Sequence, residues 1–277
     1  LIVSGNFDPA QLDRWVDQYF AGIENPARPV PRFERPVAPP RTTPRVVEAY
    51  APNVPLPAIA AIYPGVKASS PDMAPLLVLE QVLAGGDSSR LHQSLVYRQQ
   101  LASSVSVGLD AMEEDGSFSA IATLAQGKTI ADAEGALNAE LAKVRDAPIS
   151  ADELAEAKTE ILSSALRRRE TANGRAFLLG SAIIDEHDPT APDRQLAAIQ
   201  AVTVADVQRV ARRYLDENAR VSIRYQDESQ RPAGVGEDSW KNPAPMPTFL
   251  TVPPAILPPN ELLPEGQRTA PPAPGPA

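Results

Sequence analysis

The chain lacks cysteine entirely, so disulfides, cysteine nucleophiles, Cys-ligated zinc and iron–sulfur clusters are excluded. Histidine is nearly absent too, with only two residues, His92 and His187. No apolar run approaches the ~20 residues that a membrane-spanning helix needs, so no transmembrane segment is expected. The chain also lacks a basic excess: its formal charge is −9 and its pI is about 4.9, which argues against a nucleic-acid partner.

What remains is the composition of a globular protein. The chain has 277 residues, of which 43% are hydrophobic, enough for one large or two small domains. It starts without Met at a short apolar segment, residues 1–4, which we expect to be a strand, so we interpret the chain as a fragment or processed product. The composition leaves the compartment unknown, although its Ala- and Pro-rich style favours a bacterial extracytoplasmic (periplasmic) location.

Two proline-rich stretches organise the chain. Residues 26–57 contain ten prolines and predict an extended connector, and residues 226–277 contain thirteen and predict a tail. Such a tail buries too little surface to offset its own ordering entropy, so a disordered tail is one interpretation. The other is a linker that joins two halves of a longer chain. The predicted folded domain spans residues 58–225, and residues 1–25 carry a helix that begins at Pro9.

Hydrophobic periodicity predicts the elements of the folded region. The predicted strands are 46–50, 58–63, 103–112, 117–124 and 220–225, with an acidic hairpin tip at 113–116. The predicted helices begin at 70–71 and cover 129–146, 152–185, 193–201 and 204–215. Ser150-x-x-Glu153 and Thr203-x-x-Asp206 are capping-box starts. The pattern predicts an α+β fold in which helices pack on one face of an antiparallel sheet.

The most informative stretch is residues 83–105, which predict a helix, a glycine turn, a second helix and a strand. Gly85 and Gly86 are suited to end the first helix, and Asp87, Ser88 or Ser89 is suited to cap the second. On spacing alone, a generic helix–turn–helix corner explains this stretch.

The run Leu83-Ala84-Gly85-Gly86-Asp87-Ser88-Ser89-Arg90-Leu91, with its continuation to Val105, resembles a segment of the pitrilysin/insulinase family of zinc metallopeptidases. The resemblance extends over most of residues 1–225. It implies a second, non-zinc domain of a half-molecule, preceded at residues 1–25 by the end of a zinc-binding domain. The resemblance makes the turn a structural motif, whose members are Gly85, Gly86, Ser88, Ser89, Arg90 and Leu91.

The zinc site of that family is an H-x-x-E-H helix with a distal Glu ligand. His92 and His187 lie 95 positions apart, and neither belongs to such a motif. We expect His92 to be a partly exposed helix residue and His187 to be stabilised by a helix C-terminus. The resemblance therefore implies no metal in this chain, and zinc in the parent protein or in a partner's zinc-binding domain.

The family also uses an Arg and a Tyr seven positions apart to hold substrate and the developing oxyanion. The matching positions here are Val96 and Ser103, and neither side chain suits that role. Tyr97 and Arg98 are close in sequence but lie on other sides of the helix from Val96. No catalytic residue is therefore expected in this chain.

The resemblance implies a non-catalytic portion of a zinc-dependent peptidase, forming part of the wall of a peptide-degrading chamber. Its partners would be the rest of the same polypeptide, or a zinc-bearing homologous subunit, together with peptide substrates. The alternative is a stand-alone inactive homologue that acts as a scaffold or assembly subunit. A separate basic triplet, residues 167–169, is interpreted as a solvated helix face or a docking patch for acidic neighbours.

Overall fold

The structure is a computed structural model that describes residues 1–24, 27 and 40–234. The chain divides into two compact units, Leu1–Ala233 and Gly234–Ala277. Of the predicted connector 26–57, residues 27 and 40–57 are described, and they include the strand Arg45–Ala51; of the predicted tail 226–277, only residues 226–234 are described.

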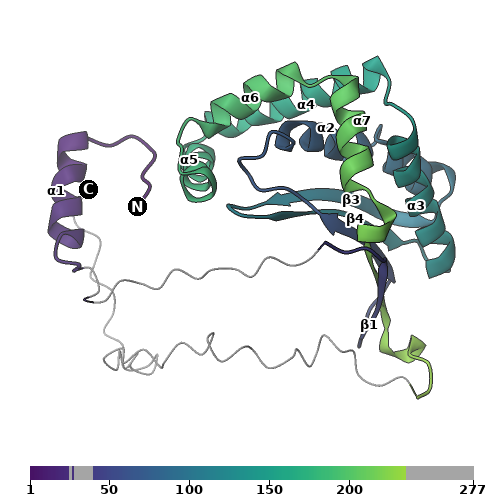
Figure 1. Cartoon of the computed structure of the whole chain (residues 1–277). Coiled ribbons are helices and arrows are strands. Elements are labelled where there is room, and N and C mark those ends of the chain that lie inside the picture. The colour runs from purple at the N-terminus through teal and green to yellow at the C-terminus, as the bar shows by residue number, and fades with distance from the viewer. Residues whose placement is uncertain (25–26, 28–39, 235–277) are drawn as a thin grey trace. The chain divides into compact units, whose positions relative to one another are not determined.

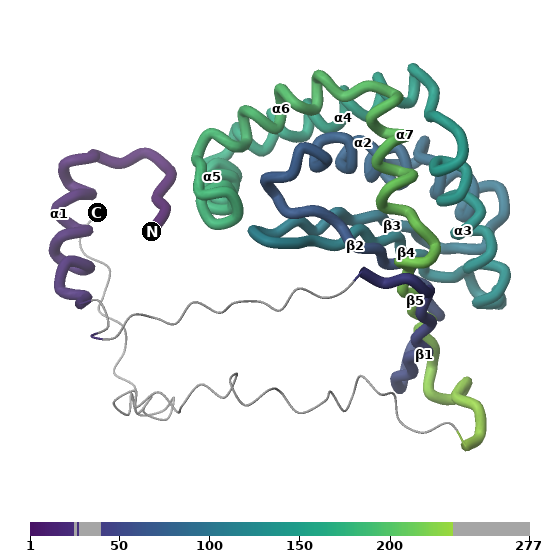
Figure 2. The backbone as a smooth tube through the Cα atoms, in the orientation of Figure 1, coloured from purple at the N-terminus to yellow at the C-terminus, as the bar shows by residue number. Residues whose placement is uncertain are grey.

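Five strands form one sheet in the order β1-β5-β2-β4-β3 (Figures 1 and 2). They are β1 (Arg45–Ala51), β2 (Ala58–Pro64), β3 (Ala102–Ala111), β4 (Gly116–Leu124) and β5 (Val221–Asp227). The predicted α+β fold is confirmed. Three neighbouring pairs are antiparallel, as predicted, whereas β1 and β5 run parallel. A parallel pair needs a long crossover between its strands, and here the whole helical layer lies between β1 and β5 in the sequence.

Seven longer helical segments follow or precede these strands. They are α1 (Pro9–Phe20), α2 (Met73–Ala84), α3 (Ile130–Asp146), α4 (Ala151–Glu170), α5 (Ala172–Glu186), α6 (Ala191–Ala201) and α7 (Val204–Tyr214). Shorter helical turns are the π-helical η1 (His92–Arg98) and the 3₁₀ turns η2 (Glu217–Ala219) and η3 (Glu228–Gln230). Figure 1 shows α2, α4, α6 and α7 on one side of the strands.

The predicted helix over 152–185 is wrong at one point, because the structure divides it at Thr171. The Thr171 backbone is extended, with φ −97° and ψ 147°, and its hydroxyl accepts a hydrogen bond from the Gly174 N–H at 3.0 Å. Thr171 therefore ends α4 and caps α5. The short strand predicted at residues 1–4 is also not formed, and a strand without a pairing neighbour has no stability of its own.

Strand alternation divides the sheet into two faces. The helix-facing side chains of β2 and β4 are buried in the main hydrophobic core; they are Ile59, Ala61, Tyr63, Phe118, Ala120, Ala122 and Leu124. Helix residues such as Leu76, Leu79 and Leu137 complete this core. Burying one such side chain contributes roughly 1.5–3 kcal/mol, so this layer accounts for most of the fold's stability.

The N-terminal helix α1 has the cap that its sequence predicts. The Asp8 carboxylate accepts a hydrogen bond from the Gln11 N–H at 2.7 Å, and Pro9 occupies the first helical turn. No residue of α1 is buried, and its apolar residues Trp15, Tyr19 and Phe20 are exposed.

Candidate functional site

The glycine corner between α2 and η1 requires glycine for two different reasons. Gly86 has φ +98°, a conformation that L side chains rarely adopt. At Gly85, an added Cβ would clash with the Gln81 side chain and with the Gln81 carbonyl oxygen. The Gln81 Nε2 in turn donates a hydrogen bond to the Gly85 carbonyl oxygen at 3.1 Å. Both glycines are therefore explained by the local backbone.

The rest of the corner is tied to the start of α4. The Arg90 guanidinium makes a bidentate pair with Glu153, with Nε–Oε1 2.6 Å and Nη2–Oε2 2.9 Å. Ser88 Oγ donates to Glu156 Oε1 at 2.6 Å, and Leu91 is fully buried. The hydrogen bonds from Arg90 hold the pKa of Glu153 down at about 2. These contacts tie the turn at residues 88–90, directly before η1, to the start of α4.

The two positions predicted to replace the family's Arg/Tyr pair lie at the end of η1 and the start of β3. Val96 is partly buried against the core, and the exposed Ser103 donates a hydrogen bond to the Thr123 carbonyl oxygen at 3.3 Å. Their neighbour Tyr97 is 72% exposed. Whether Val96 and Ser103 correspond to the family positions stays a prediction.

The two histidines each contact an acidic residue rather than each other. His92 Nδ1 lies 3.2 Å from the Asp87 carbonyl oxygen, and His187 Nε2 lies 2.8 Å from Glu113 Oε1. His187 ends α5 in a left-handed conformation. The described residues contain no group of three or more His, Asp or Glu side chains that could hold a metal ion. They do not fit a catalytic zinc, which needs about three protein ligands and an open position.

Comparison with known families identifies the chain. Residues 1–161, more than half of the chain, match the family model described as the Peptidase M16 inactive domain. The chain belongs to the M16 (pitrilysin) peptidase family. No curated protein sequence gives a significant match to this M16 inactive domain.

Solved structures support the same assignment. A chain described as a candidate zinc protease from Bordetella pertussis Tohama I is 30% identical, with a TM-score of 0.56, and the match covers 61% of this M16 chain and 93% of that one. A protease from Helicobacter pylori has a TM-score of 0.75 at 19% identity, covering 80% and 54%. A chain of complex III2 from Candida albicans has a TM-score of 0.67 at 15% identity, covering 80% and 53%. The last two show a shared fold, and this chain spans about half their length.

Two buried carboxylates of this M16 domain belong to structural networks. Burial acts to raise the pKa of Asp72, but hydrogen bonds from Tyr214 and Arg209 outweigh burial and keep that pKa below its ordinary value. The distances are 2.8 Å from Tyr214 and 2.6 Å from Arg209, so Asp72 links α2 to α7. At Glu140, bonds from Lys143 and Ser94 likewise outweigh burial and lower the pKa.

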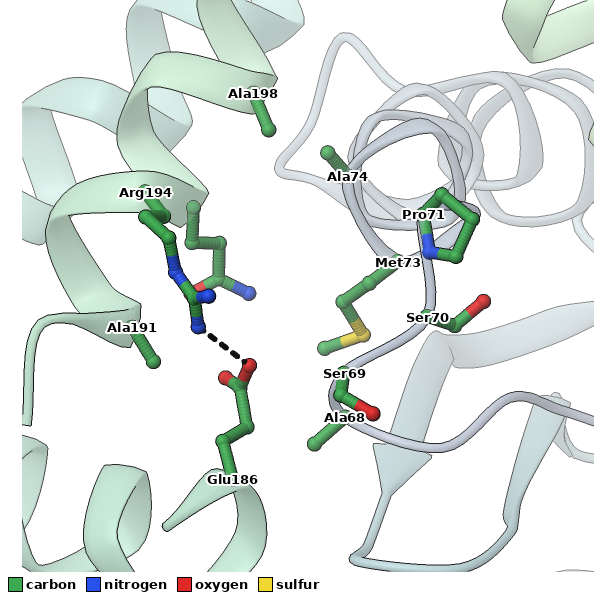
Figure 3. Close-up of a pocket in the computed structure, with 11 residues that line it drawn as sticks. Ala68, Ser69, Ser70, Pro71, Met73, Ala74, Glu186, Ala191, Arg194 and Ala198 are labelled. Carbon is green, nitrogen blue, oxygen red and sulfur yellow. Dashed lines mark hydrogen bonds and ion pairs between the residues drawn. The ribbon is translucent and has the colours of Figure 1, made fainter. Parts of the chain in front are cut away.

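A first hollow lies between the loop before α2 and the ends of α5 and α6 (Figure 3). Its volume is about 240 Å³, and its walls include Met73, Glu186 and Arg194. Arg194 is already paired, at 3.1 Å from Glu186 and 3.2 Å from Asp188. Because this arginine has its partners within the domain, the hollow offers little charge to a ligand.

A second, larger cavity adjoins the first, sharing Met73 and Gln195 in its walls. It contains Glu80, whose pKa burial raises to about 7, against the lowering effects of a hydrogen bond from the Leu109 backbone and of the Arg168 charge. Sequence analysis named Arg168 only as part of a basic triplet and did not name Glu80. The available signal was that Glu80 is the one charged residue of the mostly apolar helix Met73–Ala84.

Among the described residues, no helix is both long and apolar enough to cross a bilayer.

Proposed function

We propose that this domain forms part of the inner wall of a peptide-degrading chamber in a zinc-dependent M16 peptidase. The zinc would be supplied by the preceding domain of the same polypeptide or by a zinc-bearing homologous subunit. In this proposal the chain contributes surface and geometry, and it contributes no catalytic group.

The observation that carries the proposal is the second face of the sheet. No helix within residues 40–234 packs on this face (Figure 1). The strand register aligns Val47, Ile223, Ala60 and Ile121 in one row across four strands. Ile121 is 39% exposed and the nearby Tyr225 is 36% exposed. The open face is mainly apolar over β1, β5 and β2, whereas over β4 and β3 it carries mostly serine and threonine, as the register of Ser106, Ser119 and Thr123 shows. An extended peptide offers side chains and backbone groups that complement such a mixed face.

The division of the chain follows from this proposal. We assign residues 1–25 to the end of a zinc-binding domain, 26–57 to a connector, 58–225 to the inactive domain and 226–277 to a tail or inter-half linker; the end of the connector contributes β1 to the domain's sheet. Val96 and Ser103 would occupy the places of the family's Arg and Tyr. We infer that the turn formed by Gly85, Gly86, Ser88, Ser89, Arg90 and Leu91 acts as a structural joint of this domain, supported by the bonds of Ser88 and Arg90 to α4.

The alternative is an inactive subunit that assembles with a zinc-bearing homologue and has no peptide of its own. The Candida albicans chain with this fold belongs to a multisubunit complex, complex III2, which favours such a role. The two proposals differ in one property, the contact of the open sheet face with peptides.

The test uses the native protein that contains this chain, isolated with its remaining segments or subunits. Ile121→Glu places a charge on the open face, and Leu166→Glu places the same charge on an exposed position of α4 as the matched control. We expect Ile121→Glu to lower kcat/KM for fluorogenic peptides about tenfold, or ~1.4 kcal/mol, with unchanged zinc content. The Leu166→Glu control is expected to match the wild type.

Equal activity of both variants would remove the chamber-wall proposal. A zinc-bearing assembly without any peptidase activity would support the inactive-subunit alternative. If the isolated chain hydrolysed peptides in a chelator-sensitive manner, the prediction that it contains no catalytic residue would be wrong.

A further inference from the structure

The larger cavity lies in the helical layer, on the opposite side of the sheet from the open face. Helices α2, α4, α5 and α6, with Leu109 of β3, enclose a volume of about 430 Å³. Pockets for small organic ligands typically have ~300–1,000 Å³, so the cavity is large enough for one. Its position makes it independent of the proposed chamber wall.

Most of the cavity wall is aliphatic. The aliphatic side chains come from four helices and one strand; they are Leu77, Leu109, Ile161, Leu178, Leu196 and Ile199. Such a wall favours an apolar ligand body, because moving each methylene from water into it contributes roughly 0.8 kcal/mol.

The charged groups in the wall are Glu80, Arg168 and Arg169. The exposed Arg168 side chain makes no hydrogen bond or close ion pair with any residue that the structure describes, although its charge acts on Glu80. Arg169 Nη1 donates to Asp193 Oδ1 at 2.7 Å, but its buried Nε has no partner within the described chain. The exposed Arg168 guanidinium therefore offers hydrogen-bond donors beside an aliphatic cavity, whereas the Arg169 Nε is shielded from solvent.

We propose that this cavity binds an aliphatic carboxylate, with its apolar body among the leucine and isoleucine side chains and its carboxylate on the Arg168 guanidinium. Guanidinium donors match carboxylate oxygens in geometry and charge. A cationic ligand fits less well, because it would face Arg168, and because the Glu80 carboxyl already accepts a hydrogen bond from the Leu109 backbone. The carboxylate belongs either to a free aliphatic acid or to the C-terminus of an apolar peptide.

Glu80 gives this site a pH dependence. The charged groups that line the cavity with it are Arg168 and Arg169 of α4, while α2 and α6 add the neutral Gln81 and Gln195. Below pH ~7 Glu80 is mostly protonated and donates a hydrogen bond to a bound carboxylate. Above pH ~7 it is ionised and repels that carboxylate, so affinity falls as the pH rises.

The test measures binding to the full chain by calorimetry at pH 6 and pH 8, with octanoate, N-acetyl-leucyl-leucine as the free acid, and octylamine. Arg168→Gln removes the free guanidinium. Arg167→Gln is the matched control, because Arg167 is the preceding residue of α4, does not line the cavity and is paired with Glu160. We expect carboxylate binding at pH 6, a loss of about tenfold in Arg168→Gln, and no change in Arg167→Gln.

Glu80→Gln is expected to keep the pH 6 affinity and to abolish the decrease at pH 8. Binding of octanoate without the dipeptide would assign the site to free aliphatic acids, and the opposite result would assign it to peptide C-termini. The proposal fails if octylamine binds more tightly than octanoate, if neither acid binds, or if both arginine variants bind alike. The calorimetry does not measure the peptidase activity of the native assembly. Its outcome therefore does not decide the chamber-wall proposal.

Discussion

The two ends of α4 use charge in opposite ways. At its start, Ser150 and Glu153 form a complete capping box, and the same Glu153 carboxylate binds Arg90. Toward its end, the exposed Arg168 side chain makes no hydrogen bond or close ion pair with a described residue, although its charge acts on Glu80. A charged group whose bonds are complete within the fold stabilises the fold. An exposed charged group without such bonds is available to a ligand.

Removing a charged side chain should therefore affect stability differently at the two ends of α4. Removing Glu153 leaves the partly buried Arg90, 23% exposed at its side chain, without its counter-charge. Removing Arg168 leaves no group unsatisfied, because Arg168 makes no hydrogen bond or ion pair in the described chain. Stability measurements on the two ends of one helix can therefore separate a structural joint from a candidate binding wall.

The largest effect is expected for Glu153→Ala. This change removes the capping box together with the bidentate pair to Arg90, so we expect a loss of about 2–3 kcal/mol in the free energy of unfolding. Urea denaturation at pH 7 measures it, with Arg168→Ala as the control at the other end, expected to stay within about 0.5 kcal/mol of the wild type. Equal losses in both variants would contradict the contrast between the two ends.

The pKa of Glu153 predicts the pH range in which this carboxylate stabilises the fold. The pKa of Glu153 is about 2 in the folded chain and 4.5 as the ordinary value. Its contribution to stability is therefore present above pH ~4.5 and is lost as the pH falls toward ~2. The difference in the free energy of unfolding between the wild type and Glu153→Ala should decrease as the pH falls through that range.

The sequence predicted much of the first end of α4 and little of the second. Ser150-x-x-Glu153 is a local pattern, so the cap could be found from spacing alone. The pair between Arg90 and Glu153 joins residues 63 positions apart, and only the folded corner brings them together. The break at Thr171 was missed because helical periodicity continues on both sides of it, although threonine is a good N-cap residue.

The fold as a whole was easier to predict from the sequence than the cavity. Alternating strands and periodic helices determine which faces are buried, which is why the α+β architecture was predicted correctly. The direction of β5 beside β1 was not, because alternation is the same in parallel and antiparallel strands. A cavity depends on how four helices meet, and no local pattern of residues contains that information.

The next largest effect concerns Glu80, the carboxyl that faces the second end of α4. Its folded pKa of about 7 lies above the ordinary 4.5, so its protonated form favours folding, and this advantage is lost as the pH rises through ~7. Glu80→Gln keeps the neutral form at every pH. We expect it to stabilise the chain by on the order of 1–2 kcal/mol at pH 8, after discounting for partial solvent screening, and by little at pH 4.5.

Thermal unfolding of the wild type and Glu80→Gln across pH 4.5–8 measures this. The matched control is Glu156→Gln, a carboxyl at the first end of α4 that is hydrogen-bonded by Ser88 and exposed. A stability difference for Glu80→Gln that stays constant with pH would mean that Glu80 does not titrate in this range.

The smallest loss of stability is expected for Ser88→Ala, at the edge of the turn formed by residues 88–91. Ser88 Oγ donates to Glu156 Oε1 at 2.6 Å, but the contact is exposed, so water replaces either partner when the other is removed. We expect a loss of at most about 0.5 kcal/mol, and the same loss in the Ser88→Ala/Glu156→Gln double variant. A loss near 2 kcal/mol would instead give Ser88 the same importance as Arg90. The contact with α4 would then depend on the whole Ser88–Leu91 turn, because the bidentate pair of Arg90 and Glu153 alone would not hold this turn against α4.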